Sequence, residues 1–244
     1  MILNHIRLRG APGPGAMVAP LDKLYYAQKL SAQRLRRVYK IAAPRLRQYL
    51  EAEIAFVNQR IRPGDRVLEL GCGYGRATAR MAERAGEAWG ADNSLASLQL
   101  GKSLHPRLRL AVMDAAELGF ADHSFDLTAC VQNGVSAFKV DPARLLSECL
   151  RVTRPGGLVL LSSYAAEFWP HRLEWFRAQA AEGLLGRIDE EATGDGVIVS
   201  RDGFRAVTFA PRDFQALAAS CGVRGRITTV DRSSVFCEIT APGG

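Results

Sequence analysis

Hydrophobic and polar positions at the start of the chain follow a helical period. Between residues 24 and 42, apolar side chains recur at the spacing i, i+3, i+4 and i+7, and Pro44 interrupts the pattern. A second apolar stripe runs over residues 46–61 with one polar exception, Glu53, until Arg-Pro-Gly at 62–64 stops it. The pattern therefore predicts two helices ahead of residue 62.

From residue 66 onward, short apolar runs alternate with helical patterns. The runs that we expect to be strands cover residues 66–70, 88–91, 108–113, 125–131 and 158–163. The helical patterns between them cover residues 77–85, 94–104 and 142–152. Apolar strands that alternate with helices predict a parallel sheet with both faces covered.

The alternation stops after Tyr164 and resumes near the end of the chain. Residues 171–185 look helical and unusually aromatic, and a hairpin is expected around residues 201–204. A helix at 211–220 and two strands, at 226–230 and 235–240, close the chain. This final strand pair predicts a mixed sheet whose last strand is antiparallel.

These elements predict one α/β domain over residues 22–244. Residues 22–61 form its N-terminal helices, and residues 165–210 form an insertion after the fifth strand, placed to cap a substrate. A length of 244 residues and 48% hydrophobic content suffice for one such core.

The first residues carry no signal of a secreted or membrane protein. Residues 1–21 are basic and contain Ala-Pro-Gly-Pro-Gly at 11–15, but lack the apolar core of a secretory signal. A transit peptide stays open, although Pro and Gly would interrupt its helix. We expect a disordered tail, with Met17 as a second candidate start. No run approaches eighteen apolar residues, so we predict a cytoplasmic protein without a membrane span.

Charge and cysteine usage narrow the chemistry further. Residues 1–50 hold ten Lys and Arg side chains and one acid, so the net charge of +7 belongs to an N-terminal arm and the body is nearly neutral. A basic body would have indicated nucleic acid. Five scattered cysteines without a Cys-x-x-Cys pair, and four scattered histidines, predict neither disulfides nor a metal site.

A glycine-rich loop, Glu69-Leu-Gly-Cys-Gly-Tyr-Gly75, joins the first strand to the following helix. Such a loop lets a ligand lie against bare backbone at a helix N-terminus. Its third glycine follows the second by two residues, not by three as in dinucleotide-binding loops. Glu69 would be unfavourable beside a pyrophosphate but suits the positively charged methionine end of a sulfonium cofactor.

Two further acids follow the next two strands. Asp92, beside Asn93, ends the second strand, where a carboxylate accepts both ribose hydroxyls of a nucleoside. Asp114 ends the third strand, where it can accept from an adenine amine while the Ala115 N–H donates to a ring nitrogen. Three acids at three successive strand ends predict an adenosyl site.

Together these motifs resemble the class I S-adenosylmethionine-dependent methyltransferases. The resemblance covers roughly residues 22–163 and extends more loosely to 241. The matching segments are 67–75 (first motif), 89–94 (ribose acid), 113–118 (adenine acid), 125–132 (fourth strand) and 145–161 (the helix, turn and strand that follow). It implies a Rossmann-like, doubly wound, seven-stranded sheet with a reversed last strand, S-adenosylmethionine as methyl donor, S-adenosylhomocysteine as product, and no metal.

The candidate cofactor-binding residues are Glu69, Gly71, Cys72, Gly73, Gly75, Asp92, Asn93, Asp114, Ala115, Gln132 and Tyr25. The sequence indicates the methyl acceptor less specifically than the cofactor. The loop after the fourth strand, Gln132-Asn-Gly-Val-Ser136, lacks the Asn/Asp-Pro-Pro-Tyr of amino-group enzymes, and Cys130 lacks a preceding Pro. Nucleic acid is therefore not expected as the substrate.

Several residues are candidates for the substrate pocket, each with a structural alternative. Tyr25 and Tyr26 stand where related small-molecule enzymes lay an aromatic lid over the cofactor, or they pack in a core. Asn133 either orients a polar substrate or forms a plain turn. The remaining candidates are Tyr164 and Trp169 for an apolar pocket or a hydrophobic clamp, Arg205 for a substrate carboxylate or solvent, and His171 as the one candidate base.

We therefore predict an enzyme, a methyltransferase of class EC 2.1.1.-, acting by in-line displacement on a nitrogen, oxygen or sulfur atom of a small molecule. It would be a monomer or a homodimer. Two alternatives stay open: an RNA methyltransferase that uses the basic arm, and a non-catalytic protein that binds S-adenosylmethionine.

Overall fold

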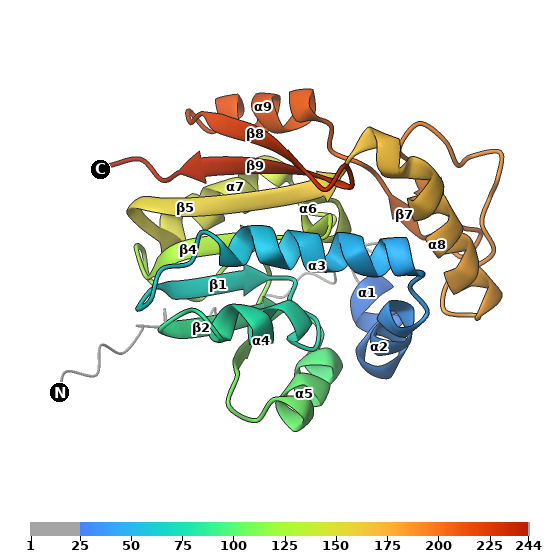
Figure 1. Ribbon diagram of the computed structural model, residues 1–244, viewed down its shortest axis with the longest axis horizontal. Helices are drawn as coiled ribbons and strands as arrows, with labels where there is room; N and C mark the ends of the chain where they lie inside the picture. The colour runs from blue at the N-terminus through green and yellow to red at the C-terminus, as the bar shows by residue number, and fades with distance from the viewer. Residues whose placement is uncertain (1–24, 244) are drawn as a thin grey trace, which may run out of the picture.

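A seven-stranded sheet forms the centre of the computed structural model, which describes residues 25–243 (Figure 1). Its strands lie in the order β3-β2-β1-β4-β5-β9-β8. Their bounds are β1 Arg66–Leu70, β2 Glu87–Asp92, β3 Arg109–Val112, β4 Phe125–Cys130, β5 Thr153–Tyr164, β8 Gly225–Val230 and β9 Ser234–Thr240. All strands are parallel except β9, which runs antiparallel to β5 and β8. The predicted fold class is confirmed.

Helices cover both faces of this sheet. Their bounds are α3 Pro44–Asn58, α4 Arg76–Ala82, α5 Leu95–Leu104, α6 Gly134–Ala137, α7 Pro142–Val152 and α9 Pro211–Ser220. On one face, α3 and α4 pack against Leu127 and Leu160. On the other, α7 and α9 pack against Val159 and Leu161. Neighbouring residues of β5 thus point into opposite cores, as the alternation of side chains along a strand requires.

The register of the strands gathers their carboxyl ends at one edge. Leu70 of β1 pairs with Ala91 of β2, and Asp92 pairs with Val112 of β3. The segments that follow these strands therefore start side by side. This is the edge where open parallel sheets bind their ligands.

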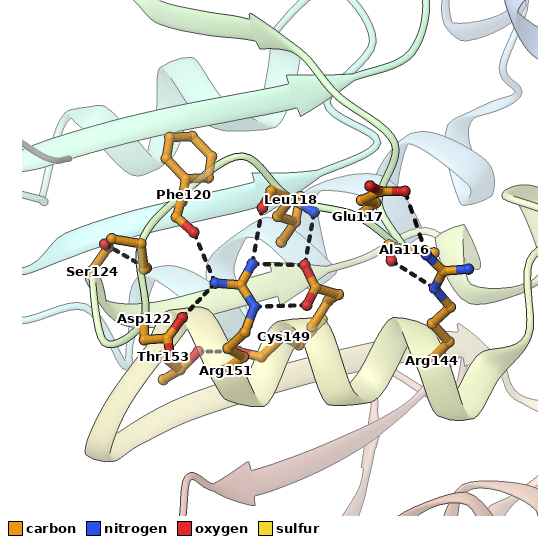
Figure 2. Close-up of polar contacts among 12 residues, drawn as sticks. Ala116, Glu117, Leu118, Phe120, Asp122, Ser124, Arg144, Cys149, Arg151 and Thr153 are labelled. Atoms are coloured by element: carbon orange, nitrogen blue, oxygen red, sulfur yellow. Dashed lines mark hydrogen bonds and ion pairs between the residues drawn. The ribbon is translucent and has the colours of Figure 1, made fainter. Parts of the chain in front are cut away.

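Arginines of α7 fasten the link between β3 and β4, and Arg151 makes most of these contacts (Figure 2). Arg151 donates to the backbone oxygens of Leu118 at 2.9 Å and Phe120 at 2.8 Å, and to Asp122 at 2.8 Å. It also forms a two-pronged ion pair with Glu148, which accepts from the Leu118 N–H at 2.7 Å. This network fixes the path of residues 116–124.

The N-terminal helices lie beside the segment that follows β5 (Figure 1). They are α1 Tyr25–Gln28 and α2 Ala32–Lys40, and the segment contains η2 Ala166–Phe168, α8 Trp169–Ala181 and the hairpin β6 Ile198–Val199 with β7 Arg205–Ala206. Leu30, Val38, Trp175, Phe176 and Phe204 are buried together in a core that does not include the strands from β1 to β4.

The single helix expected over residues 24–42 was wrong, because the chain breaks between α1 and α2. Ser31 is extended, and Ala32 adopts a left-handed φ of 49°. The Ala32 N–H donates to the Ser97 hydroxyl of α5 at 2.9 Å. A tertiary hydrogen bond therefore replaces the helical one.

Three contacts fasten these helices to the segment after β5. The Tyr25 hydroxyl donates to Asp202 at 2.7 Å, Arg34 donates to the Gly183 carbonyl at 2.7 Å, and Arg37 pairs with Glu182 at 2.7 Å. The tail predicted for residues 1–21 lies outside the described residues. Within the described part of the chain, no helix combines the length and apolar character needed to cross a membrane.

Candidate active site

A cavity lies over the carboxyl ends of β1, β2 and β4. The glycine-rich loop, the end of β2 and the segment after β4 form its floor. Tyr26 of α1, Tyr39 of α2, and Trp175 and Phe176 of α8 are among the residues of its opposite wall. The cavity is thus enclosed between the sheet edge and the layer made by the N-terminal helices and α8.

Two glycines let neighbouring side chains of the cavity come close to the loop. Gly71 and Gly73 have φ values of 71° and 56°, in the left-handed region that favours glycine. A Cβ at Gly71 would lie 2.6 Å from a ring carbon of Phe138, and one at Gly73 would lie 2.7 Å from a methyl of Leu35. Side chains at these positions would clash with residues that line the cavity.

Glu69 is the buried acid of the loop. Its side chain is 4% exposed and accepts a hydrogen bond from the Thr78 hydroxyl. Burial raises the pKa of Glu69 to about 7, against the opposing effects of Thr78 and the Arg76 guanidinium. A cationic ligand group at this place would stabilise the ionised carboxylate.

Asp92 is held by backbone donors at the end of β2. One carboxylate oxygen accepts from the Gly73 N–H and the other from the Ser94 N–H, both at 2.8 Å. Each oxygen keeps a further lone pair for a ligand hydroxyl. Burial raises the pKa of Asp92, and the two backbone N–H groups oppose that shift.

Arg76 directly follows the glycine-rich loop and was missed from the sequence. Its guanidinium lies 4.6 Å from the centre of the Tyr39 ring, and its Nε and Nη2 are buried without a hydrogen-bond partner among the described residues. A carboxylate of Glu51 lies 3.7 Å from Nη1. The signal available in the sequence was an arginine next to the third glycine.

The segment after β4 has a strained backbone where it lines the cavity. Gln132 and Asn133 have φ values of 56° and 62°, which are uncommon for residues with a Cβ. The Gln132 N–H donates to Glu53 at 2.7 Å and to the Ser162 hydroxyl at 2.9 Å. Its side-chain oxygen accepts from the Tyr39 hydroxyl at 3.2 Å, while its Nε2 has no partner among the described residues.

Glu53 is the polar exception that interrupts the apolar stripe of α3. Its side chain is fully buried and accepts a hydrogen bond from the strained Gln132 backbone N–H. Burial raises the pKa of Glu53 to about 7, and the hydrogen bond from the Gln132 N–H works against that shift. The sequence marks Glu53 as a polar position in an apolar stripe but predicts no role for it.

The cavity brings together many of the candidates, and it leaves others outside. The candidates that line it are Glu69, Gly71, Cys72, Gly73, Asp92, Asn93, Gln132, Tyr26 and Tyr164. Those outside its lining are Tyr25, Gly75, Asp114, Ala115, Asn133, Trp169, His171 and Arg205. Ligand contact by any of these residues stays a prediction.

Contacts within the protein explain two of the residues outside. The Tyr25 hydroxyl is bound to Asp202 and not to the cavity. Both ends of the Asn133 amide are engaged, with Nδ2 donating to the Val207 carbonyl at 3.0 Å and Oδ1 accepting from Ser163 at 2.7 Å. Asn133 therefore ties the end of the insertion to β5.

Three further candidates, Asp114, His171 and Arg205, are exposed. Asp114 is exposed and accepts from the Ala116 N–H at 2.8 Å, in the loop next to the end of β2. His171 and Arg205 are exposed on α8 and β7, so neither faces the cavity. A role of His171 as a base stays a prediction. Within residues 25–243, no cluster of three or more potential metal ligands occurs.

The residues of the cavity fit an adenosyl sulfonium cofactor. Glu69 supplies a buried carboxylate, Asp92 supplies two oxygens at one strand end, and the unpartnered donors of Arg76 and Gln132 supply sites for an anionic group. The left-handed Gly71 and Gly73 leave the backbone bare between them.

A family model described as "Methyltransferase domain" matches residues 67–157. A Mycolicibacterium smegmatis protein named "Probable S-adenosylmethionine-dependent methyltransferase" is 31% identical over 187 residues, covering 66% of this chain and 72% of its own. The demethylmenaquinone methyltransferase of Beutenbergia cavernae is 38% identical over 109 residues, 44% of each chain, so the match spans less than half of that relative. The solved structure of a Pyrococcus horikoshii protein superposes with a TM-score of 0.64 at 17% identity, covering 89% of this chain and 98% of that one.

Proposed function

The chain belongs to the S-adenosylmethionine-dependent methyltransferases, and from this premise we propose that it methylates a small molecule held in the enclosed cavity. The observation that carries the proposal is the continuity of the cavity. It extends from the cofactor-type groups Glu69 and Asp92 to an aromatic wall that includes Tyr26, Tyr164 and Trp175.

We assign the end of the cavity that contains Glu69, Asp92 and Arg76 to the methyl donor, because of its charged groups, and call it the donor end. Asp92 accepts the two ribose hydroxyls, as acids at this strand end do in nucleoside-binding sheets. Glu69 faces the cationic part of the methionine moiety, and the free Nε and Nη2 of Arg76 receive its carboxylate. The bound cofactor supplies an electrophilic methyl group, and the residues around it orient both reactants and exclude water.

The acceptor end of the cavity favours a compact, flat molecule. Its wall includes the rings of Tyr26, Tyr49, Tyr164, Trp175 and Phe176. Aromatic side chains stack well on planar rings. The name of the Beutenbergia relative also refers to a ring-bearing molecule, because menaquinone is a quinone. Methylation at nitrogen, oxygen or sulfur of such a molecule depends chiefly on alignment, which contributes roughly 7–11 kcal/mol when positioning is good.

The function is tested by product formation from natural mixtures. Small-metabolite extracts and purified total RNA are incubated separately with the protein and S-adenosylmethionine, and S-adenosylhomocysteine release is measured. We expect release with the metabolite fraction alone, followed by identification of the methylated product by mass. Release with RNA alone would overturn the small-molecule assignment, and tight cofactor binding without release from either would favour the non-catalytic alternative.

Asp92→Ala tests the assignment of the donor end. We expect this substitution to weaken S-adenosylmethionine binding by about tenfold or more, because two hydrogen bonds to a charged acceptor are lost. Asp92→Asn keeps the shape and one acceptor oxygen, so we expect a smaller loss. The affinities are measured by calorimetry.

A matched control for Asp92→Asn is Asp141→Asn. Asp141 is an exposed carboxylate that caps α7 and lies outside the cavity, and asparagine caps helices equally well. We expect unchanged cofactor affinity in this control. Wild-type affinity in Asp92→Ala would contradict the placement of the ribose.

A further inference from the structure

Arg172 is a fully buried cation on α8. Its side chain is 0% exposed, and it is among the largest side chains buried to that extent. Among the described residues, no Asp or Glu oxygen lies within ion-pair distance of it. Burial lowers the pKa of Arg172, since desolvation disfavours its charged form. A buried charge without a counter-ion is costly, so this residue requires an explanation.

One edge of the Arg172 guanidinium is occupied and the other is free. Nη1 donates to the Gly196 carbonyl at 2.8 Å and to the Thr208 hydroxyl at 2.6 Å. Nε and Nη2 are buried without a partner among the described residues. These two nitrogens form the side edge of the guanidinium, whose parallel N–H groups match the two oxygens of a carboxylate.

Arg172 is not itself part of the cavity lining, but it packs against residues that line the acceptor end of the cavity. The guanidinium carbon lies 4.6 Å from the centre of the Tyr164 ring and 5.7 Å from that of Phe176. Both residues line the cavity, as do Tyr26 and Tyr49, whose hydroxyls also interact electrostatically with Arg172. Burial raises the pKa values of all three tyrosines, so they stay neutral and do not balance the charge of Arg172.

The donor end of the cavity has its own guanidinium. Arg76 follows the glycine-rich loop and acts on the pKa of Glu69, whereas the groups that act on Arg172 are tyrosines. The carboxylate of the cofactor is therefore provided for at Arg76. The free edge of Arg172 is left for the other reactant.

We propose that the methyl acceptor is a carboxylic acid whose carboxylate binds the Nε–Nη2 edge of Arg172. The proposal rests on the proposed function and specifies its substrate class. One guanidinium supplies a single charge, which matches a carboxylate and not a doubly charged phosphate. The hydroxyls of Tyr26, Tyr49 and Tyr164 supply neutral donors beside it, and the surrounding rings pack on the apolar part of the acid.

The experiment compares acids with their neutral amides in the complex with S-adenosylhomocysteine. Calorimetry measures binding of benzoate against benzamide, and of phenylacetate against phenylacetamide, to the wild type, Arg172→Met and Arg172→Lys. We expect at least one acid to bind the wild type at least tenfold more tightly than its amide. The preference should disappear in Arg172→Met and persist, reduced, in Arg172→Lys, which keeps the charge but loses the paired donors.

Binding of S-adenosylhomocysteine separates the possible failures. If the affinity of Arg172→Met for S-adenosylhomocysteine changes by twofold or less, the fold and the donor end are intact. If that variant does not fold, Arg172→Lys is decisive. A wild type that binds S-adenosylhomocysteine but prefers neither acid overturns the proposal, as does a preference that survives in Arg172→Met. A wild type that does not bind S-adenosylhomocysteine overturns the proposed function itself.

Discussion

Two buried carboxyl groups illustrate how single residues shape this site. Glu69 and Glu53 both have pKa values raised to about 7 by burial. Glu69 faces the cavity from the loop, whereas Glu53 lies beneath it and accepts from the strained Gln132 N–H. Strained backbone at a binding site has to be held by its surroundings, and Glu53 provides this support.

Glu53→Gln tests the cost of this burial through pH. The folded-state pKa near 7 exceeds the ordinary value of 4.5, so the stability that the neutral carboxyl contributes is present below pH 4.5 and is lost as the pH rises to 7. Between pH 5 and 8 the free energy of unfolding of the wild type should fall by about 2 kcal/mol more than that of Glu53→Gln. Urea denaturation at the two pH values measures the difference.

The control for this substitution is Glu51→Gln on the same helix. Glu51 is exposed, so its replacement should leave the pH-dependent loss as in the wild type. An equal loss in Glu53→Gln and Glu51→Gln would show that Glu53 is not the source of the effect.

Sequence analysis identified residues whose roles follow from contiguous motifs. Glu69 and Asp92 were found because the loop and the strand end place them irrespective of the rest of the chain. Arg172 was not singled out, and Glu53 was given no role, because an arginine or a glutamate on a helix has a meaning only when its neighbours are known. Arg172 faces residues from α1, α3 and β5, which no local pattern connects.

At the scale of elements, the loop between β3 and β4 depends on α7 for its position. The side chain of Arg151, 18% exposed, binds three groups of that loop and Glu148, whereas Arg144 makes one backbone contact at 3.0 Å and is 61% exposed (Figure 2). The carboxylate of Glu148 and the neighbouring Asp122 raise the pKa of Arg151. The loop that carries Asp114 is thus fixed by one side chain more than by any other shown in this network.

Arg151→Met should destabilise the protein more than Arg144→Met. Loss of hydrogen bonds between charged groups in a largely buried network costs about 2–3 kcal/mol, whereas an exposed contact contributes less than about 1 kcal/mol. Urea denaturation of the two variants measures this difference. Equal destabilisation would mean that the loop does not depend on the Arg151 network.

The elements themselves were largely predictable, and the differences have local causes. Apolar runs located the seven strands, including the edge strands β3 and β8, which are only partly buried. The turn expected between the helix at 142–152 and the strand at 158–163 is instead part of β5, where the Gly156 N–H donates to the Ala241 carbonyl of the last segment. The break between α1 and α2 also depends on a distant partner, Ser97.

At the scale of the whole molecule, the cavity is closed by two parts that lie far apart in the sequence. The N-terminal helices contact the insertion through Tyr25, Arg34 and Arg37, and both contribute residues to the same wall. Movement of either part therefore opens the cavity on the same side.

Tyr25→Phe should loosen this closure without altering the sheet. It removes one hydrogen bond to Asp202, and we expect S-adenosylhomocysteine to dissociate about fivefold faster, since such a bond contributes about 1 kcal/mol. Amide exchange in α1, α2 and α8 should rise together. Stopped-flow release and hydrogen exchange measure these effects.

Arg177→Met provides the comparison. It removes an ion pair with Glu190 that lies within the insertion and joins nothing to the N-terminal helices. We expect wild-type release from this variant. Faster release in Arg177→Met than in Tyr25→Phe would show that the stability of the insertion, and not its contact with α1, controls opening.

The shared core of the N-terminal helices and the insertion also constrains how the chain folds during synthesis. Residues that leave the ribosome first find their partners last, since Tyr25 and Asp202 are 177 positions apart. Until then α2 can pack on α5 but lacks its contacts with α8, and the strands from β1 to β5 can assemble first. A ribosome-bound chain that lacks residues 169–206 therefore has the cofactor edge of the sheet without the cavity wall that α8 provides.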